Sequence, residues 1–413
     1  MPIFILTIIA VMFLADAWWW WRADRLLRPL RYQRVLRGLL AVFMVGCIGG
    51  LGTVIASRLV LPAGASMGPV ALAGLFIWHF IVLPAVAIPS LLLWIAGKAV
   101  WLIGRLRSEP APPVGPQPAA AVVEPTLTRR QLLGAAISAA PPLITAIGTT
   151  RAMGQLDEFR TRRIVVPVPN LPTDLDGMTI VQVSDVHVGH FTRGKTLGRI
   201  VDAVNNLRPD LIMHTGDLIN HALSDLPAAL DMTRRLEGRF GQFLCEGNHD
   251  LIESRAGFEQ SVTAAGLPLL LNTTVEARVR GVPVQVLGLR WGWPATIQRF
   301  SERRSPDEAI VASMGSLIAQ RNADAFGILL AHHPHAFDIA ANAGIPLTLS
   351  GHTHGGQLHL SPGLGFGPVM YRYWSGLYQR GDASLVVSNG VGNWFPLRIN
   401  APAEIVHITL RRS

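Results

Sequence analysis

Long apolar stretches in the first 150 residues constrain the fold of this chain more than any other feature. Residues 2–21 are apolar apart from Asp16 and end in four tryptophans. About 20 apolar residues span a bilayer, and tryptophan prefers the membrane interface. Similar stretches follow at 38–57, 69–104 and 131–150. We therefore predict an all-α transmembrane region over residues 1–104, and a further transmembrane helix or signal anchor over residues 128–150.

The charges divide along the same line. Residues 1–150 carry 12 Lys and Arg against 4 Asp and Glu, whereas residues 151–413 carry 24 against 23. The basic excess therefore belongs to the apolar part of the chain, which favours membrane topology over a nucleic-acid-binding surface. We expect a membrane, and no nucleic acid, among the partners.

Arginines predict the orientation of the spans. The six arginines between residues 22 and 37, together with Arg129 and Arg130, indicate cytoplasmic segments, because loops inside the cell are rich in basic residues. If 69–104 is a single span, everything after residue 150 lies outside the cytoplasm. Pro84 and Pro89 could instead split this stretch into a hairpin, which would reverse the side.

A Pro- and Ala-rich linker is predicted over residues 105–127. The sequence Thr128-Arg129-Arg130-Gln131-Leu132-Leu133 follows it and precedes a weakly hydrophobic run. This arrangement resembles a twin-arginine export signal. The alternative is an ordinary span flanked by two cytoplasmic arginines, and both interpretations leave the arginines inside the cell.

Residues 151–413 have the pattern of an α/β domain. Short apolar stretches that predict buried strands alternate with amphipathic stretches that predict helices, which is typical of a largely parallel sheet. The expected strands are 178–184, 210–215, 241–245, 326–331, 346–350 and 384–388, and the expected helices are 195–207, 223–237 and 306–322. Residues 268–289 predict an antiparallel meander around Gly281.

Blocks of Asp, Asn and His follow five of these expected strands. They are Asp185-Val186-His187, Gly216-Asp217, Gly247-Asn248-His249-Asp250, His332-His333-Pro334 and Gly351-His352-Thr353-His354. Ligand sites in open α/β sheets form at the carboxyl ends of strands, so the fold would bring these blocks to one edge. Imidazole, carboxylate and amide groups without thiolates favour Mn, Fe, Zn or Mg, and two such metals recur in phosphoester hydrolysis.

Other classes are excluded by the same residues. Cys47 and Cys245 are the two cysteines of the chain, too few for a disulfide framework or a cysteine-built zinc finger. The sequence contains neither a GxGxxG fingerprint after a strand nor a GxxxxGK[ST] loop, so nucleotide binding of those kinds is not supported.

The five blocks, in this order over roughly 176–413, resemble the calcineurin-like metallophosphoesterase superfamily. Asp-Leu-Asp-Gly at 174–177 and Gly-Gly-Gln after His354 resemble its membrane-attached or exported bacterial subgroup. The resemblance implies an α/β fold over 151–413, with a central β-sandwich flanked by helices. It also implies two divalent metal ions as cofactors and a phosphoester as substrate.

The resemblance also implies roles for individual residues. Asp185, His187 and His354 would bind the first metal, Asp217 would bridge, and Asn248, His332 and His352 would bind the second. His249 would be the catalytic acid for the leaving oxygen. His333 is the alternative to His332, which is preferred because the family usually places one residue between this histidine and a proline. Many relatives have an acid where this chain has Asn220, so Asp250 or a backbone carbonyl would orient His249 instead.

The sequence thus predicts a membrane-anchored phosphoesterase in which a metal-bridging hydroxide attacks phosphorus. The expected location is the bacterial inner membrane, with several spans and a periplasmic catalytic domain, and tethering makes a lipid-linked substrate a reasonable class. The alternatives are a non-catalytic, metal-stabilised scaffold and a membrane sensor. For a sensor, the spans lack an evident ionisable cluster and offer Asp16, His79 and Lys98 as candidates.

Aromatic residues in the expected loops have two interpretations. They either pack against the sheet edges or form an apolar lip that admits a lipid or docks on the bilayer. These residues are Trp291, Trp293, Phe300, Tyr371, Tyr373, Trp374 and Tyr378.

Overall fold

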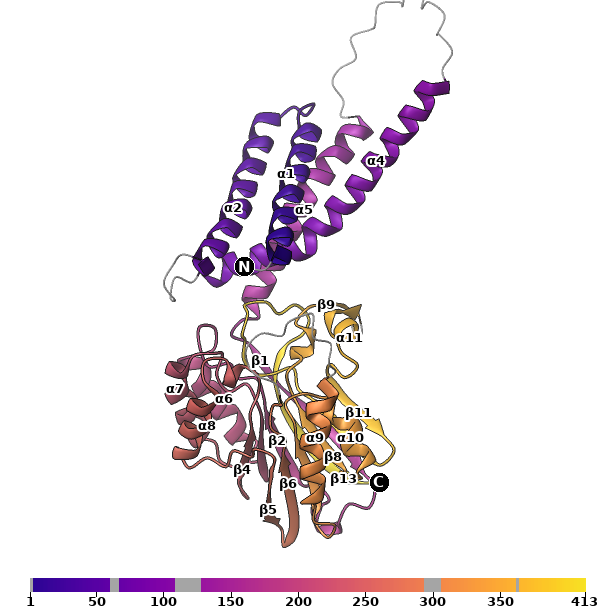
Figure 1. Cartoon of the computed structure of the whole chain (residues 1–413). Helices are drawn as coiled ribbons and strands as arrows, with labels where there is room; N and C mark the ends of the chain where they lie inside the picture. The colour runs from indigo at the N-terminus through magenta and orange to yellow at the C-terminus, as the bar shows by residue number, and fades with distance from the viewer. Residues whose placement is uncertain (1–2, 60–66, 108–127, 293–305, 362–363) are drawn as a thin grey trace, which may run out of the picture. The chain divides into compact units, whose positions relative to one another are not determined.

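The computed structural model describes residues 3–59, 67–107, 128–292, 306–361 and 364–413. The chain divides into two compact units, Met1–Arg151 and Ala152–Ser413, and each is described by itself (Figure 1). Residues 108–127 of the expected linker, and Trp293 and Phe300 among the aromatic residues, lie outside the described residues.

The first unit consists of long apolar helices. They are α1 (Ile3–Leu27), α2 (Gln33–Leu59), α3 (Pro69–Phe76), the π-helix η1 (Ile77–Val82), α4 (Leu83–Arg107) and α5 (Arg129–Gly154). Because α3, η1 and α4 continue without a break, residues 69–104 form one helix and not a hairpin. In the described part of the chain, four helices are long and apolar enough to cross a membrane.

The π-helix η1 lies where a proline disturbs the long helix. Pro84 has no N–H to donate to the carbonyl of Phe80, and single turns of this kind frequently mark functional sites. Within η1, Trp78 Nε1 donates to Asp16 Oδ1 at 2.8 Å, and His79 Nε2 lies 3.0 Å from Asp16 Oδ2. All three side chains are buried. The expectation that the spans lack an ionisable cluster is therefore corrected: α1 and η1 bring Asp16 and His79 together.

α5 begins at Arg129 because Thr128 caps it. Thr128 Oγ1 accepts a hydrogen bond from the N–H of Gln131 at 3.2 Å, and Gln131 Oε1 accepts one from the N–H of Thr128 at 2.9 Å. This reciprocal pair is a capping box, which satisfies two backbone donors at the start of a helix. The paired arginines thus occupy the first turn of α5.

The second unit is a β-sandwich flanked by helices, so the predicted fold class is confirmed. Its sheets have the orders β1-β13-β2-β3-β4 and β11-β12-β8-β7-β6-β5. The first sheet contains β1 (Phe159–Val168), β2 (Thr179–Val183), β3 (Leu211–Thr215), β4 (Gln242–Cys245) and β13 (Ala403–Arg412). The second contains β5 (Thr273–Val279), β6 (Val282–Gly288), β7 (Phe326–Leu330), β8 (Leu347–Ser350), β11 (Gly376–Arg380) and β12 (Ala383–Val387). A small ladder pairs β9 (His359–Ser361) with β10 (Leu364–Gly365).

Helices cover the outer face of each sheet (Figure 1). α6 (Lys195–Asn206), α7 (Leu226–Arg234) and α8 (Arg255–Ala264) pack on the first sheet, and α9 (Pro306–Ala319) and α10 (Ala336–Asn342) on the second. Short helices are η2 (Thr173–Leu175), η3 (Leu223–Asp225), η4 (His249–Leu251), η5 (His354–Gly356) and α11 (Phe366–Met370). In β2, Ile180 faces the core between the sheets, whereas Val181 and Val183 face the helices, because side chains alternate along a strand.

Strand directions define the edge at which the site forms. β2, β3 and β4 are parallel, so their carboxyl ends lie at one edge of the first sheet. β13 is antiparallel to β2 and parallel to β1, so Phe159 and Ala403, at the starts of β1 and β13, lie at this same edge. Sequence patterns did not predict β1 and β13, since β1 is an edge strand that carries three arginines and a proline.

Candidate metal centre

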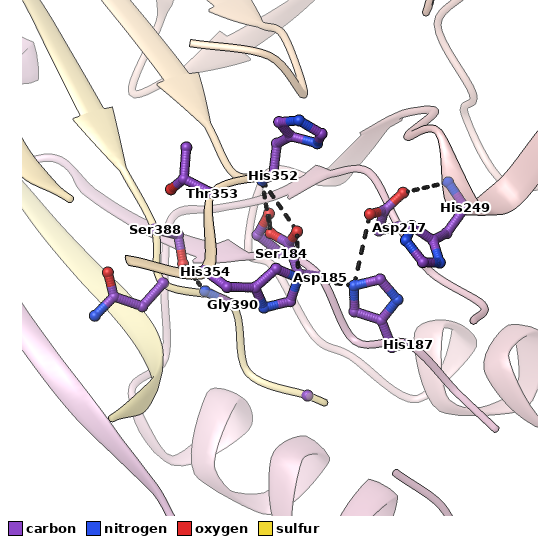
Figure 2. A network of polar contacts seen from close by, with 12 residues as sticks. Ser184, Asp185, His187, Asp217, His249, His352, Thr353, His354, Ser388 and Gly390 are labelled. Atoms are coloured by element: carbon purple, nitrogen blue, oxygen red, sulfur yellow. Dashed lines mark hydrogen bonds and ion pairs between the residues drawn. The ribbon is translucent and has the colours of Figure 1, made fainter. Parts of the chain in front are cut away.

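The five blocks at the strand ends converge on one place, and Figure 2 shows residues of four of them: Asp185 and His187, Asp217, His249, and His352 and His354. Asp185 follows β2, Asp217 follows β3, Asn248 follows β4, His332 follows β7, and His352 and His354 follow β8. Two groups among the described residues have ligand atoms within 4.8 Å of one another. They are Asp185, His187, Asp217 and His354, and Asp217, His332 and His352. Asp217 belongs to both groups.

In the first group, imidazole nitrogens face each other between carboxylates. His187 Nε2 lies 2.9 Å from His354 Nε2 and 3.5 Å from Asp217 Oδ2. His354 Nε2 lies 3.3 Å from Asp185 Oδ1. Nitrogen and oxygen atoms that converge in this way are the donor set that divalent metals such as Mn, Fe and Zn prefer. The residues present therefore fit a divalent cation.

The second group is organised around His332. Its Nδ1 donates to the carbonyl of Thr215 at 2.6 Å, which leaves Nε2 facing Asp217 Oδ2 at 3.1 Å. A hydrogen bond made by the ring nitrogen that does not bind the metal fixes the orientation of a metal-binding histidine. His352 Nδ1 lies 3.0 Å from Asn248 Oδ1, which adds the amide oxygen to this side of the centre.

His333, the alternative to His332, belongs to neither group. Its ring centroid lies 4.4 Å from that of His335 and 5.0 Å from that of His352. The histidine whose nitrogen faces Asp217 is therefore His332.

The backbone at the centre is held in an uncommon conformation. Five of the seven expected ligands have φ between 48° and 72°: Asp185, His187, Asp217, His352 and His354. Residues other than glycine rarely adopt positive φ values. Backbone strain of this kind clusters at functional sites. Close packing adds to it, because a Cβ on Gly390 would lie 2.6 Å from the Cβ of Asp185.

Burial and neighbouring charges set the protonation of the centre. Burial lowers the pKa of His352 to about 3 and also lowers the pKa values of His187 and His354. Burial opposes the charge of Asp217, but His332 and His249 outweigh it and hold the Asp217 pKa well below its usual range. These three histidines are thus neutral and Asp217 is ionised, as metal ligands must be.

Two other groups have raised pKa values. Burial raises the pKa of Asp185 to about 6. For His332, burial acts to lower the pKa, but the carboxylate of Asp217 outweighs it and raises the pKa to about 9. The two causes differ, since burial disfavours the charged form of Asp185, whereas a neighbouring opposite charge favours the charged form of His332.

His249 touches the centre through its backbone and its ring. Its N–H donates to Asp217 Oδ1 at 2.8 Å, and its ring centroid lies 4.6 Å from that of His187. Nδ1 donates to the backbone carbonyl of Asn220 at 2.6 Å, so a carbonyl orients this histidine. Asp250, the other option, accepts hydrogen bonds from the backbone N–H groups of Ile219 and Gly247 instead.

Sequence reasoning missed Arg398. This buried arginine places Nη2 3.1 Å from His354 Nδ1, and it donates from Nη2 to the carbonyl of Gly392 at 2.7 Å and from Nε to Asn393 Oδ1 at 2.6 Å. The signal available was the block Asn389-Gly390-Val391-Gly392-Asn393, which follows the sixth expected strand as the other blocks follow theirs.

Of the aromatic residues expected to form a lip, some pack within the domain and others lie beside the metal centre. Tyr373 packs on Phe337 at 5.5 Å between ring centroids, and the ring of Trp374 lies 4.8 Å from that of His359. The rings of Trp291 and Tyr371 instead lie 5.3 and 6.0 Å from that of His352.

Comparisons with known proteins agree with this geometry. The family model described as calcineurin-like phosphoesterase matches residues 178–356. The chain is 30% identical over 253 residues to the metallophosphoesterase YkuE of Bacillus subtilis, covering 58% of this chain and 82% of that protein. It is also 30% identical over 272 residues to a transmembrane protein with metallophosphoesterase domain from Danio rerio, covering 60% of this chain and 57% of the relative. Phosphodiesterase YaeI of Escherichia coli is 28% identical over 230 residues, which cover 54% and 78% of the two chains.

The fold, the centre and these matches define the class of the protein: it is an enzyme of the phosphoester hydrolase type. The chain belongs to the calcineurin-like phosphoesterase family, which confirms the resemblance seen in the sequence. The similar proteins come from bacteria and from animals, so the resemblance is broader than a bacterial subgroup. The match spans little more than half of the Danio rerio protein.

Proposed function

We propose that this chain is a membrane-anchored phosphoesterase that hydrolyses a phosphate ester with two divalent metal ions, Mn, Fe, Zn or Mg. One observation carries the proposal: Asp217 Oδ2 lies 3.1 Å from His332 Nε2 and 3.5 Å from His187 Nε2, and these histidines belong to different ligand groups. A carboxylate shared by two ligand groups suits a pair of cations. Asp185, His187 and His354 would hold one cation, and Asn248, His332 and His352 the other, with Asp217 between them.

The metals and His249 would divide the chemistry. When bound, the metals would activate a water for in-line attack on phosphorus and neutralise charge on the phosphoryl oxygens. His249 donates a hydrogen bond from Nδ1 to the carbonyl of Asn220, so in the imidazolium form the proton on Nε2 is the one that would pass to the leaving oxygen, which leaves the neutral ring. The name of the Escherichia coli relative, a phosphodiesterase, supports a diester as substrate.

The helices supply the anchor in this proposal. Residues 1–104 and 128–150 act as membrane anchor, with the linker 105–127 between them, and residues 151–413 form the catalytic domain. The four apolar helices and the basic residues at 22–37 and at Arg129 and Arg130 support a multi-pass protein of a bacterial inner membrane, with the catalytic domain in the periplasm. A phosphatase reporter fused after Ser413 is active if the domain is periplasmic and inactive if it is cytoplasmic.

The activity is tested on the full chain purified in detergent. We expect hydrolysis of bis(4-nitrophenyl) phosphate that is lost after chelation and restored by Mn. A His214→Gln variant is the control for substitutions of the ligand histidines and should keep this activity. His214 is a buried histidine of β3 that lies outside both ligand groups, and its Nε2 lies 3.2 Å from Gln242 Oε1. A chain that hydrolyses no phosphoester after loading with each of the four metals contradicts the proposal and leaves the scaffold alternative.

The sensor alternative is favoured by one observation, the buried contact between Asp16 and His79. Ionisable groups inside a membrane span are costly and are usually functional. If the helices sense a signal through this pair, Asp16→Asn changes the hydrolysis rate of the reconstituted full chain. An unchanged rate in Asp16→Asn and His79→Gln, with the protein still folded, excludes the sensor role.

A further inference from the structure

An exposed apolar projection stands beside the metal centre. It consists of Leu364, Phe366, Val369 and Met370, on β10 and α11, and Val369 and Met370 are 82% and 64% exposed. Clustered apolar side chains of this size on a short segment indicate an interaction surface, whereas isolated ones do not. This projection is formed by residues other than the aromatic residues expected to form a lip.

The projection is fixed to the backbone of the site. α11 packs on η5, which begins at His354, and the backbone of Gly367 lies directly against Gly356. Tyr371, the next residue after α11, places its ring 6.0 Å from that of His352. Whatever the projection contacts is therefore held next to the metal centre.

The chain leaves its last apolar helix at this same edge. α5 ends at Gly154, and Leu156, two residues later, accepts a hydrogen bond at its carbonyl from Asn393 Nδ2 at 2.6 Å. Asn393 in turn accepts a hydrogen bond from Arg398, whose Nη2 lies 3.1 Å from His354 Nδ1. Two side chains thus link the incoming segment to a residue of the centre, and β1 then starts at the carboxyl edge of β2.

This connection limits how far the centre can be from the bilayer. If α5 spans the membrane, five Cα–Cα steps from Gly154 to Phe159 extend over about 18 Å at most. Two of the catalytic unit's features, the incoming segment and the apolar projection, therefore lie at the edge that carries the metal centre. Figure 1 shows β9 and α11 at the end of the sandwich where β1 begins.

We propose that Leu364, Phe366, Val369 and Met370 dock in the interfacial layer of the bilayer that α5 spans, so that the metal centre takes phosphoester headgroups of membrane lipids. This inference rests on the proposed phosphoesterase function and names its substrate class. Short apolar segments insert about 5–10 Å into the boundary between headgroups and acyl chains. Docking of this kind presents the ester to the centre without removing the lipid from the membrane.

The docking is measured in the full chain, reconstituted in vesicles of phosphatidylethanolamine and phosphatidylglycerol. Cys47 and Cys245 are buried, so a nitrobenzoxadiazole label reacts with an added surface cysteine at Val369→Cys. A lipid nitroxide at the top of the acyl chain should quench this label by about half or more, given the expected depth. Val165→Cys is the matched control, because Val165 is 60% exposed and pairs with Thr409, at the far end of β13 from Ala403. Equal quenching at the two positions overturns the proposal.

Hydrolysis separates the docking from the activity itself. In a Val369→Asp/Met370→Asp variant, hydrolysis of phospholipid in the vesicles should fall about tenfold, while hydrolysis of bis(4-nitrophenyl) phosphate stays within about twofold. Val165→Asp should change neither rate. If the unmodified chain hydrolyses the soluble ester but no phospholipid, or if the double variant hydrolyses phospholipid at the parental rate, the docking proposal is wrong. If the unmodified chain hydrolyses neither ester, the proposed phosphoesterase function is wrong.

Discussion

The backbone carbonyl of Asn220 lies 2.6 Å from Nδ1 of His249 and accepts a hydrogen bond from it. The side chain of Asn220 points to another partner, since its Nδ2 lies 3.2 Å from His221 Nδ1. Residue 220 therefore orients His249 through its main chain and not through its side chain. A carbonyl accepts a hydrogen bond without competing for the proton, so His249 keeps a fixed tautomer.

This hydrogen bond predicts different effects on kcat for substitutions of His249 and of Asn220. His249→Ala should retain both metals, because the contact of residue 249 with Asp217 comes from its N–H, and should lower kcat about 10²- to 10⁴-fold, the usual contribution of a general acid. Asn220→Ala should stay within about threefold of the parental kcat, because it keeps the carbonyl. Steady-state kinetics with Mn and elemental analysis test both variants. Loss of metal in His249→Ala would show that this residue is a ligand and not the acid.

Arg398 should control the first ligand group. Its guanidinium lies 3.1 Å from His354 Nδ1 and donates to a carbonyl of the loop that follows β12, and a lysine cannot reproduce this planar fork. We expect Arg398→Lys to weaken Mn binding about 10- to 100-fold, as is typical when the partner of a metal-binding histidine is lost. Calorimetric titration of the metal-free chain measures the affinity, and Arg199→Lys, on the exposed face of α6, is the control. An unchanged affinity in Arg398→Lys would mean that this arginine only packs the loop.

The predicted parts of the site are those with a local signature. Asp185, Asp217 and Asn248 follow apolar strands, and the last two lie beside glycines, so a pattern of two or three residues indicates both the strand end and the ligand chemistry. Parallel pairing of β2, β3 and β4 then brings them to one edge. The meander at 268–289 was likewise predictable, because β5 and β6 pair across a turn at Gly281.

The missed parts depend on contacts between distant segments. β1 pairs with β13 across more than 240 positions, and the charges of β1 conceal its alternation. Arg398 donates to the backbone carbonyls of residues 389, 390, 392 and 401, and it lies outside the block that follows the sixth expected strand, so its own position has no local signature. The contact of Asp16 with His79 was missed for the same reason, since it joins α1 to η1.

His214 should make the stability of the catalytic domain depend on pH. Burial lowers its pKa to about 4 in the folded chain, below the ordinary value of 6.5. Between these values the unfolded chain binds the extra proton, so this histidine stabilises the fold above about pH 6.5 and its contribution is lost as the pH falls to 4. The loss amounts to about 3 kcal/mol, at about 1.4 kcal/mol for each pKa unit.

Thermal unfolding in detergent between pH 4 and pH 7, followed by near-ultraviolet circular dichroism, measures this dependence. His214→Gln should flatten the fall in Tm toward low pH, since glutamine does not titrate. His221→Gln, at the surface, should follow the parental profile. Identical profiles for His214→Gln and the parental chain would show that His214 is not held neutral by burial.

The most direct test of the account is the metal content of an Asp217→Asn variant beside that of the parental chain. Asp217 is the one residue shared by the two groups of ligand atoms found among the described residues. After purification with Mn and removal of free metal, the parental chain should carry about two metal ions and the variant about one or none, with hydrolysis of bis(4-nitrophenyl) phosphate lost. Two metal ions retained by Asp217→Asn, or none bound by the parental chain, would contradict a centre built around this carboxylate.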